Sequence, residues 1–243
     1  MLPDVHFRAG IPCGGCHTMG GLAHGGKGRG CRECHAPSDR VLEHRIPGHL
    51  ERLECFACHS AWSAQEYGTF YLRFADPAAK EEFDLAPGGN PQYLKSSYLK
   101  RQDLPPLGVN GRGLVSPIRP QFIAFYTDIA PARGGSRENL LLSAEWRAVF
   151  PHTVQRGTPA CGACHENPRR FLMERPGEEL YLLRRDGLPL DSFWQRRGQR
   201  VTNGSFFPEE RYRTMAAGSM AYRRGEVEKW RTFVNRVVPS SAE

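Results

Sequence analysis

Eight cysteines and four of the nine histidines stand in a spacing that can carry out one specific chemistry. The cysteines form four pairs with two residues between the partners, and a histidine follows each pair directly: Cys13/Cys16/His17, Cys31/Cys34/His35, Cys55/Cys58/His59 and Cys161/Cys164/His165. Two thiols at this spacing add to the two vinyl groups of one haem, and the next residue presents its imidazole to the iron. We therefore predict four covalent c-type haems, with all eight cysteines as thioether ligands and these four histidines as proximal iron ligands.

Paired cysteines at this spacing also bind zinc, and Cys13/Cys16 with Cys31/Cys34 would supply one four-cysteine site. Zinc does not require a histidine directly after each pair, whereas all four pairs have one. No cysteine is left for a disulfide framework or for a lone nucleophile. The pattern favours haem attachment over zinc binding.

The other five histidines are candidates for the second axial position of each iron. Four of them precede a haem motif at similar distance: His6 and His24 by seven residues, His49 by six and His152 by nine. This degenerate repeat of histidine, loop and haem motif predicts His6, His24, His49 and His152 as distal ligands, with His44 as the alternative to His49.

In multihaem proteins such a histidine often binds a neighbouring haem rather than its own. Methionine is the other common distal ligand, but Met19 follows His17 too closely, and Met173, Met215 and Met220 lie in helix-like stretches. Because bis-histidine ligation lowers the reduction potential relative to His/Met ligation, we predict four low-potential haems.

Three segments must position these residues. Residues 1–62 hold three haem motifs, residues 63–150 hold none and have β-branched, aromatic and proline-rich stretches, and residues 151–243 hold the fourth motif and a helical segment. We predict one compact unit with a mostly irregular and α-helical multihaem cytochrome c fold, packed around four haems, with a small β-rich insert and a C-terminal helix.

Local patterns predict several elements. Residues 67–74 and 121–128 are typical of strands, whereas residues 139–149 indicate a short helix. Residues 208–238 have helical spacing, and the apolar residues of this stretch are expected to lie in the core: Met215, Met220, Tyr222, Val227, Trp230, Phe233 and Val237. The glycine-dense loop 19–30 is expected to run close against a haem face.

The chain has 243 residues and a formal net charge of +7. Nucleic-acid binding is the usual interpretation of a basic chain, but haem propionates would offset this charge, so we expect no nucleic-acid partner. No apolar stretch reaches the roughly 18 to 20 residues that span a bilayer, so no transmembrane segment is expected.

The first residues do not resemble a signal peptide, although haem attachment follows export. We therefore expect a periplasmic or extracellular protein whose leader has been removed or missed, or a piece of a longer export product.

Two stretches resemble a family. The sequence Cys55-Phe-Ala-Cys58-His59-Ser60-Ala61-Trp62 is similar to the C-x-x-C-H-S-x-W stretch of large extracytoplasmic multihaem cytochromes. The stretches at 106–110, 116–117 and 151–153 ahead of the fourth motif resemble the same group, which includes octahaem proteins related to tetrathionate reductase and hydroxylamine oxidoreductase. The resemblance implies a distal-ligand role for His152. It transfers no catalytic group, because no lysine replaces a proximal histidine and no clear crosslinking tyrosine is present.

The function expected from these features is electron transfer along four haems. Expected partners are redox proteins, such as a quinol-oxidising membrane complex or other multihaem subunits, and a homo-oligomer or filament joined through exposed haems. The alternative is an enzyme that acts on small nitrogen or sulfur oxyanions at one haem without a distal ligand.

Overall fold

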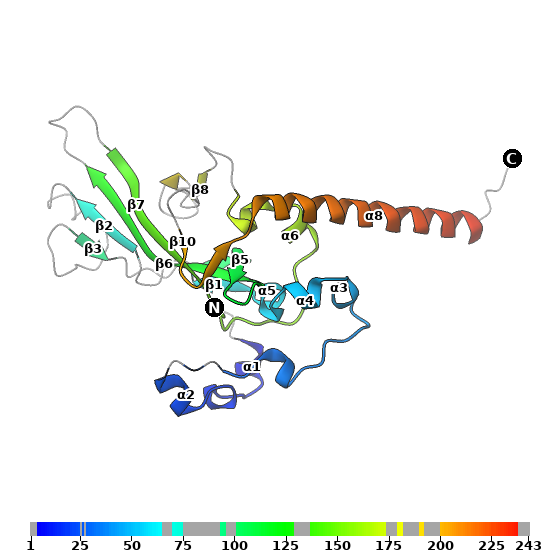
Figure 1. Ribbon diagram of the computed structural model, residues 1–243, viewed down its shortest axis with the longest axis horizontal. Helices are drawn as coiled ribbons and strands as arrows, with labels where there is room; N and C mark the ends of the chain where they lie inside the picture. The colour runs from blue at the N-terminus through cyan, green and yellow to red at the C-terminus, as the bar shows by residue number, and fades with distance from the viewer. Residues whose placement is uncertain are drawn as a thin grey trace.

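The computed structural model describes residues 4–24, 26, 28–64, 70–74, 93–95, 101–128, 137–173, 179–181, 190–191 and 200–237. The described strands form one seven-stranded sheet and two small pairs (Figure 1). The large sheet has the order β10 (Arg200–Val201), β7 (Arg137–Ala148), β6 (Val115–Asp128), β2 (Phe70–Phe74) and β3 (Tyr93–Lys95), and β5 (Leu107–Asn110) joins β6 to β11 (Gly204–Phe206). The small pairs are β1 (Trp62–Ala64) with β4 (Arg101–Asp103) and β8 (Glu179–Tyr181) with β9 (Leu190–Asp191).

The sheet confirms one local prediction and contradicts another. Residues 121–128 are the second half of β6, and β2 covers residues 70–74 of the predicted 67–74 strand, whose first three residues lie outside the described chain. The helix predicted at 139–149 is wrong, because residues 137–148 form β7 and pair with β6 from Ile118↔Ala148 to Asp128↔Arg137. The stretch has good helix formers, but ladder pairing with a long neighbouring strand outweighs local propensity.

The sheet also extends beyond the expected insert. Strands β10 and β11 come after the fourth haem motif, and they pair with β7 and β5 respectively. The segment that carries the fourth motif is therefore tied to the sheet by backbone hydrogen bonds.

Most described helices are single turns: α1 (Val5–Arg8), η1 (Cys13–Gly15), α2 (Met19–Ala23), η2 (Cys31–Glu33), α3 (Leu42–Arg45), α4 (His49–Arg52), α5 (Cys55–His59), α6 (Gly162–His165) and η5 (Pro168–Phe171). In Figure 1, α1 and α2 form a layer at the bottom, α3, α4 and α5 lie above them, and α6 lies beneath the long helix α8 (Glu209–Val237).

The buried core lies between the third and fourth haem motifs and the sheet. One cluster of buried side chains there consists of Ala57, Leu107, Val115, Phe171 and Phe207, and Ile118, Trp146, Leu172 and Val201 are also buried. Partly buried side chains pack around it, among them Cys164, Tyr212 and Met215. By contrast, no described residue from 4 to 46 is buried. The core therefore supports two of the four motifs directly.

The C-terminal helix is confirmed as α8, but its apolar residues lie mostly outside the core. Met215 is partly buried against the core, whereas Met220, Tyr222, Val227, Trp230, Phe233 and Val237 are 44–65% exposed. The core prediction is wrong for these six because the second half of α8 projects beyond the body of the molecule (Figure 1). Within the described part of the chain, no helix is long and apolar enough to cross a membrane.

Candidate haem-iron sites

Each haem motif folds into a tight turn that places its cysteines and histidine together. The backbone N–H of His17, His35 and His165 donates to the carbonyl of the first cysteine of its motif, at 2.9 Å in each case. The third motif forms α5 itself. A hydrogen bond from an N–H to the C=O four residues earlier is the α-helical pattern. The two cysteine side chains and the imidazole of each motif therefore project from a single helical turn.

The cysteines of the four motifs differ in how far the protein covers them. None of the eight is in a disulfide, and four are exposed: Cys13, Cys16, Cys34 and Cys161. Cys16 and Cys34 differ in this from their counterparts Cys58 and Cys164, which are partly covered. Cys164 packs against the core, and Cys58 directly follows the core residue Ala57. The reason is that residues 4–46 contain no buried side chain among those described, so no protein layer packs over these two sulfurs. The thioether role of all eight cysteines stays a prediction from their spacing.

The structure places a second histidine ring opposite each of the four motif histidines. The distances between ring centroids are 5.8 Å for His35–His6, 6.1 Å for His17–His152, 6.3 Å for His59–His44 and 6.1 Å for His165–His49. The partners are 15 residues apart in the His44–His59 pair and 29 to 135 residues apart in the other three. The fold therefore brings together rings that the linear chain separates.

These distances fit an iron between two imidazoles. With metal–nitrogen bonds of about 2.0–2.1 Å and a ring nitrogen about 1.1 Å from its ring centre, two trans imidazoles have centroids about 6.3 Å apart. The four observed separations lie within about half an ångström of that value.

The pairing differs from the expected distal set at one position. In the structure His44 faces His59 and His49 faces His165. The exposed ring of His24 instead has its Nδ1 at 2.8 Å from the Gly20 carbonyl of its own short helix α2. The reason is the turn between α3 and α4, where Gly48 has φ +85° and begins α4 in a new direction. His44 and His49 therefore face different partners, although the sequence spacing presents them as rivals for one site.

Hydrogen bonds at Nδ1 orient most of these rings. The Nδ1 atoms lie near backbone carbonyls: His44 with Ser38 at 3.1 Å, His49 with Glu43 at 3.0 Å, His59 with Gly157 at 3.1 Å and His165 with Met215 at 3.3 Å. A carbonyl only accepts, so Nδ1 carries the proton and Nε2 keeps its lone pair for a metal.

Burial lowers the pKa of His49 below its ordinary value, and His165 acts in the same direction. Partial burial and the neighbouring His17 likewise lower the pKa of His152. Both effects favour the neutral imidazole, which is the form that binds a metal.

Asp4 organises two of the four pairs. Its carboxylate caps α1 by accepting from the His6 N–H at 2.8 Å, and it lies 2.8 Å from His6 Nδ1. The second oxygen accepts from the Val154 N–H at 2.8 Å, and the Val5 N–H donates to the Val154 carbonyl at 2.9 Å. Asp4 therefore fixes His6 directly and fixes the segment that begins at His152.

Residues 152–157, which we call the strap, contact two of the four pairs directly and a third pair through Asp4. His152 itself faces His17 and has a left-handed backbone with φ 53°, a conformation that costs free energy outside glycine and persists only where neighbours enforce it. Thr153 is buried, and its hydroxyl donates to the Trp62 carbonyl at 2.5 Å. The Gln155 N–H donates to the His59 carbonyl at 2.9 Å. The strap therefore joins the first, second and third motifs.

Arg170 connects the third and fourth motifs. It is 3% exposed, and its guanidinium donates to the Ala57 carbonyl at 2.8 Å, to the Pro105 carbonyl at 3.5 Å and to the Cys164 sulfur at 3.0 Å. A buried charge is tolerated only when hydrogen bonds satisfy it. Arg170 therefore fixes one motif residue of each site against the core.

The cysteines also bring consecutive motifs together. A hydrogen bond between the Cys31 and Cys55 sulfurs is the main cause that raises the pKa of Cys31 and lowers the pKa of Cys55 to about 6. Burial, followed by the charge of Cys164, raises the pKa of Cys58 to about 11. The second motif is thus adjacent to the third, and the third to the fourth.

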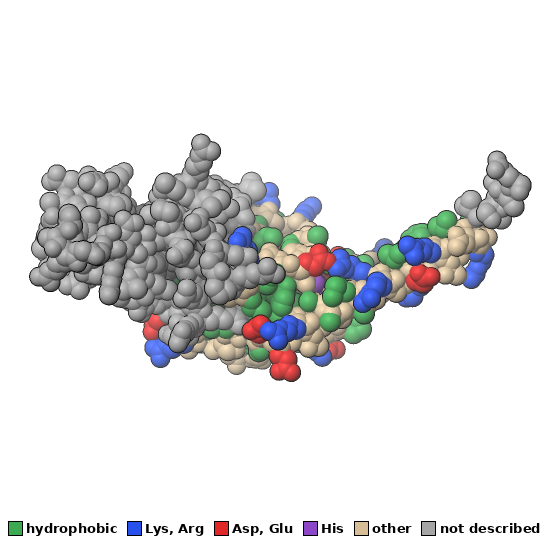
Figure 2. Space-filling view, turned by 90° about the horizontal axis from the view of Figure 1, so that it is seen from above, with side chains coloured by type: hydrophobic (Ala, Val, Ile, Leu, Met, Phe, Trp, Pro, Cys, Tyr) green, Lys and Arg blue, Asp and Glu red, His purple; other side chains and the backbone are tan. Residues whose placement is uncertain are grey.

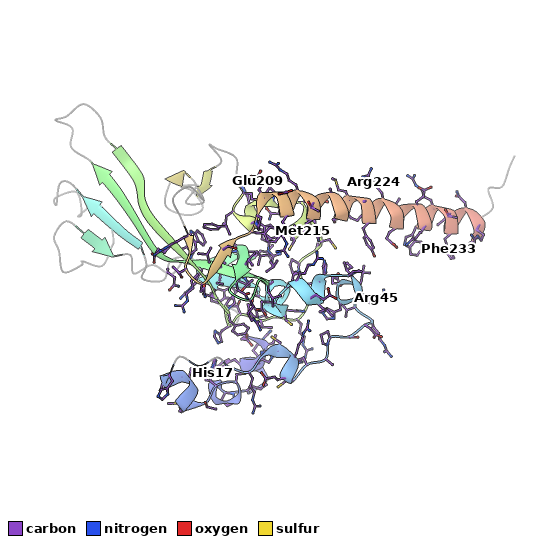
Figure 3. All side chains as sticks on the ribbon, in the orientation of Figure 1. His17, Arg45, Glu209, Met215, Arg224 and Phe233 are labelled. Carbon is purple, nitrogen blue, oxygen red and sulfur yellow. The ribbon has the colours of Figure 1, made fainter. Side chains whose placement is uncertain are left out.

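The glycine-dense loop runs close against a histidine ring at Gly28. A Cβ at Gly28 would lie 2.6 Å from Cε1 of His17, so only glycine allows the backbone to pass this close to the imidazole. The bottom layer in Figure 3 carries His17 well away from α8.

Large apolar side chains are exposed close to the iron sites. They are Phe7, Ile11, Met19, Leu22, Val41, Leu42 and Phe150, with exposed fractions of 37–82%. Each lies within five residues of a histidine that belongs to a facing pair. A flat apolar macrocycle in each site would cover such surface, which fits the haem prediction.

Among the described residues, no group of three or more His, Cys, Asp or Glu side chains converges on one point. A haem iron takes four ligands from its porphyrin and needs only two from the protein, which two facing histidines would supply. No family model, curated protein or solved structure matches the chain.

Sequence reasoning missed Asp4 and Arg170. Asp4 had one available signal, because an aspartate followed by an apolar residue and a histidine fits a helix N-cap. Arg170 directly follows another arginine, and only the fold shows that Arg170 is buried while Arg169 is exposed.

Proposed function

We propose that the chain is a tetrahaem cytochrome c that conducts electrons between redox partners. The observation that carries the proposal is the set of four facing histidine pairs at 5.8–6.3 Å, one for each haem motif. Cys13/Cys16, Cys31/Cys34, Cys55/Cys58 and Cys161/Cys164 would hold the four haems by thioether bonds. When bound, haem iron supplies reversible one-electron exchange.

The chain's residues support a conduction order that follows the sequence. Asp4 links the His6 pair of the second motif to the strap, and through it to the His152 pair of the first motif. Cys31 and Cys55 link the second motif to the third, and Cys58 and Cys164 link the third to the fourth. The proposed path therefore has its ends at the first and fourth motifs.

Catalysis at an open iron is the alternative, and the histidine placement argues for the carrier. Each motif histidine has a second imidazole opposite, so no iron is left with a free position for nitrogen or sulfur oxyanions. The two imidazoles at each iron also support low reduction potentials. An extracytoplasmic location and a redox partner, such as a quinol-oxidising membrane complex or another multihaem subunit, belong to the same proposal.

Mass spectrometry and absorbance of the haem-loaded protein test this proposal. We expect the mass of four haem additions, and ferric spectra that stay low-spin and unchanged when nitrite, hydroxylamine or sulfite is added. A high-spin fraction that shifts on adding one of these anions would contradict the carrier function and would favour the enzyme.

A further inference from the structure

The second half of α8 has an exposed apolar face that the haem sites do not explain. Val227, Trp230, Phe233, Val234 and Val237 are 48–65% exposed. The first half of the same helix contacts the fourth motif, where Met215 accepts from His165. Trp230 lies about 22 Å further along the helix axis, at a rise of 1.5 Å per residue. This face therefore lies beyond reach of the fourth haem site.

The spacing on this face is that of a helix-packing seam. From Val227 the steps to Trp230, Val234 and Val237 are three, four and three residues, which is the alternation of a and d positions in a coiled coil. Phe233, which flanks this seam, lies on the lower side of α8 together with Met215, whereas Glu209 and Arg224 lie on the upper side (Figure 3). Seen from above, basic and acidic side chains are spread along the helix (Figure 2).

We propose that a second copy of this chain covers the face, with its own α8 antiparallel over Val227–Val237. A parallel arrangement would bring the two bodies side by side along the first half of α8, where α6 contacts the helix and α3 lies below it (Figure 1). Leu42, Ile46 and Pro47 line a groove there together with Tyr222 and Glu226. In the antiparallel arrangement, the body of the second copy lies beyond the C-terminal end of α8.

Side-chain sizes support a self-complementary contact. A two-fold axis at the level of Thr232 sets Trp230 against Val234 of the second copy, and Val227 against Val237 of the second copy. A large side chain then meets a small one twice, as close packing requires. Arg231 approaches its counterpart near the axis, and Glu228, 3.8 Å from Arg231 within each chain, offsets the repulsion.

The area is sufficient for a specific, weak dimer. Aromatic side chains bury roughly 150–250 Å² each when fully covered. Two such side chains and three valines per copy bring the pair near the roughly 1,000 Å² at which specific interfaces begin. The two fourth-motif sites would lie about 50 Å apart along the helices, so the dimer tethers two carriers and leaves both haem chains open to partners.

Sedimentation equilibrium of the full, haem-loaded chain tests the proposal. Between about 1 and 100 μM we expect a monomer–dimer equilibrium, which Trp230→Glu and Phe233→Glu each weaken by at least about tenfold. Asn235→Glu is the control: it adds the same charge at nearly the same level along α8 as Phe233→Glu, but on the opposite face of the helix. It should leave the equilibrium unchanged. Haem content measured by absorbance shows that each variant is folded and loaded, independently of its association.

Crosslinking tests the orientation. The eight native cysteines are taken up by haem, so an introduced thiol is alone in its chain. A mixture of Val227→Cys and Val237→Cys chains should crosslink only between the two variants, whereas a parallel pair would crosslink each variant with itself.

A monomer at every concentration, a dimer insensitive to Trp230→Glu, or binding of the monomer to vesicles of anionic phospholipid would each overturn the proposal.

Discussion

The first two haem motifs and the last two have very different protein surroundings. The third and fourth motifs enclose the buried core, where Ala57, Phe171 and Phe207 are each 1–2% exposed. Glu54, just before the third motif, is buried and accepts from Asn110 Nδ2 at 2.6 Å and from Arg112. The first two motifs lie in residues 4–46, where no described side chain is buried.

This difference indicates which part of the protein has a buried core of its own and which part would need the proposed haems to supply one. A segment without buried apolar side chains cannot offset the conformational entropy lost on ordering. In residues 4–46, the available apolar surface would come from haem, held by thioether bonds and by the four histidines of the first two sites. We infer that haem attachment orders this layer, whereas the core beneath the third and fourth motifs has a protein framework of its own.

Removing haem should produce the largest effect. In a variant with all eight cysteines changed to serine, we expect amide protection of residues 4–46 to fall by roughly 100-fold or more relative to the haem-loaded protein. Protection of β5 and the first half of β6 should fall much less. Hydrogen exchange read by mass spectrometry measures both regions in one experiment. An equal loss of amide protection in both regions would contradict the inference that only residues 4–46 depend on haem for their order.

Arg170→Met should produce the next largest effect, confined to the core region. The variant keeps much of the side-chain volume but leaves the Ala57 and Pro105 carbonyls without their buried donor, which costs about 3 kcal/mol. Denaturant unfolding monitored at the haem absorbance measures this loss.

Arg224→Met is the matched control, since Arg224 is exposed on α8, and it should change the free energy of unfolding by less than about 0.5 kcal/mol. Similar values for the two variants would show that the third and fourth motifs do not depend on the Arg170 bonds.

Asp4→Ala should have a smaller effect, confined to the exposed layer. It removes the N-cap of α1 and the bond to Val154, at a cost of about 1–2 kcal/mol. We expect faster exchange at residues 4–17 and at 152–157, and spectral changes limited to the first and second haems.

Asp39→Ala, a change at an exposed aspartate of the same layer, should leave exchange and spectra as in the parent. Broadening of the third or fourth haem signals by Asp4→Ala would contradict the local role of this carboxylate.

Site residues can be predicted from the sequence where covalent chemistry dictates their spacing. The motif spacing predicts that each histidine acts together with the two cysteines before it, and the structure holds them in one turn. The role of the other histidines as second iron ligands stays a prediction. The sequence could not distinguish His24 from His44, because that choice depends on the turn at Gly48, and residues five positions apart look like competitors on a linear chain. It also could not show that Cys16 and Cys34 are exposed while Cys58 and Cys164 lie next to the core, since all four motifs have the same spacing. The predictions of a helix at β7 and of a buried apolar face on the second half of α8 are also wrong. Strand pairing and the extent of the body are properties of the whole fold, which local sequence patterns do not contain.

The axial ligand set is the central claim, and spin-state counting in single histidine variants tests it most directly. Magnetic circular dichroism and electron paramagnetic resonance of the ferric protein should show four low-spin haems in the parent and in His24→Ala. In His44→Ala, one of the four should become high-spin, because His59 loses its facing imidazole. A high-spin haem in His24→Ala, together with four low-spin haems in His44→Ala, would contradict the arrangement of histidine pairs described above.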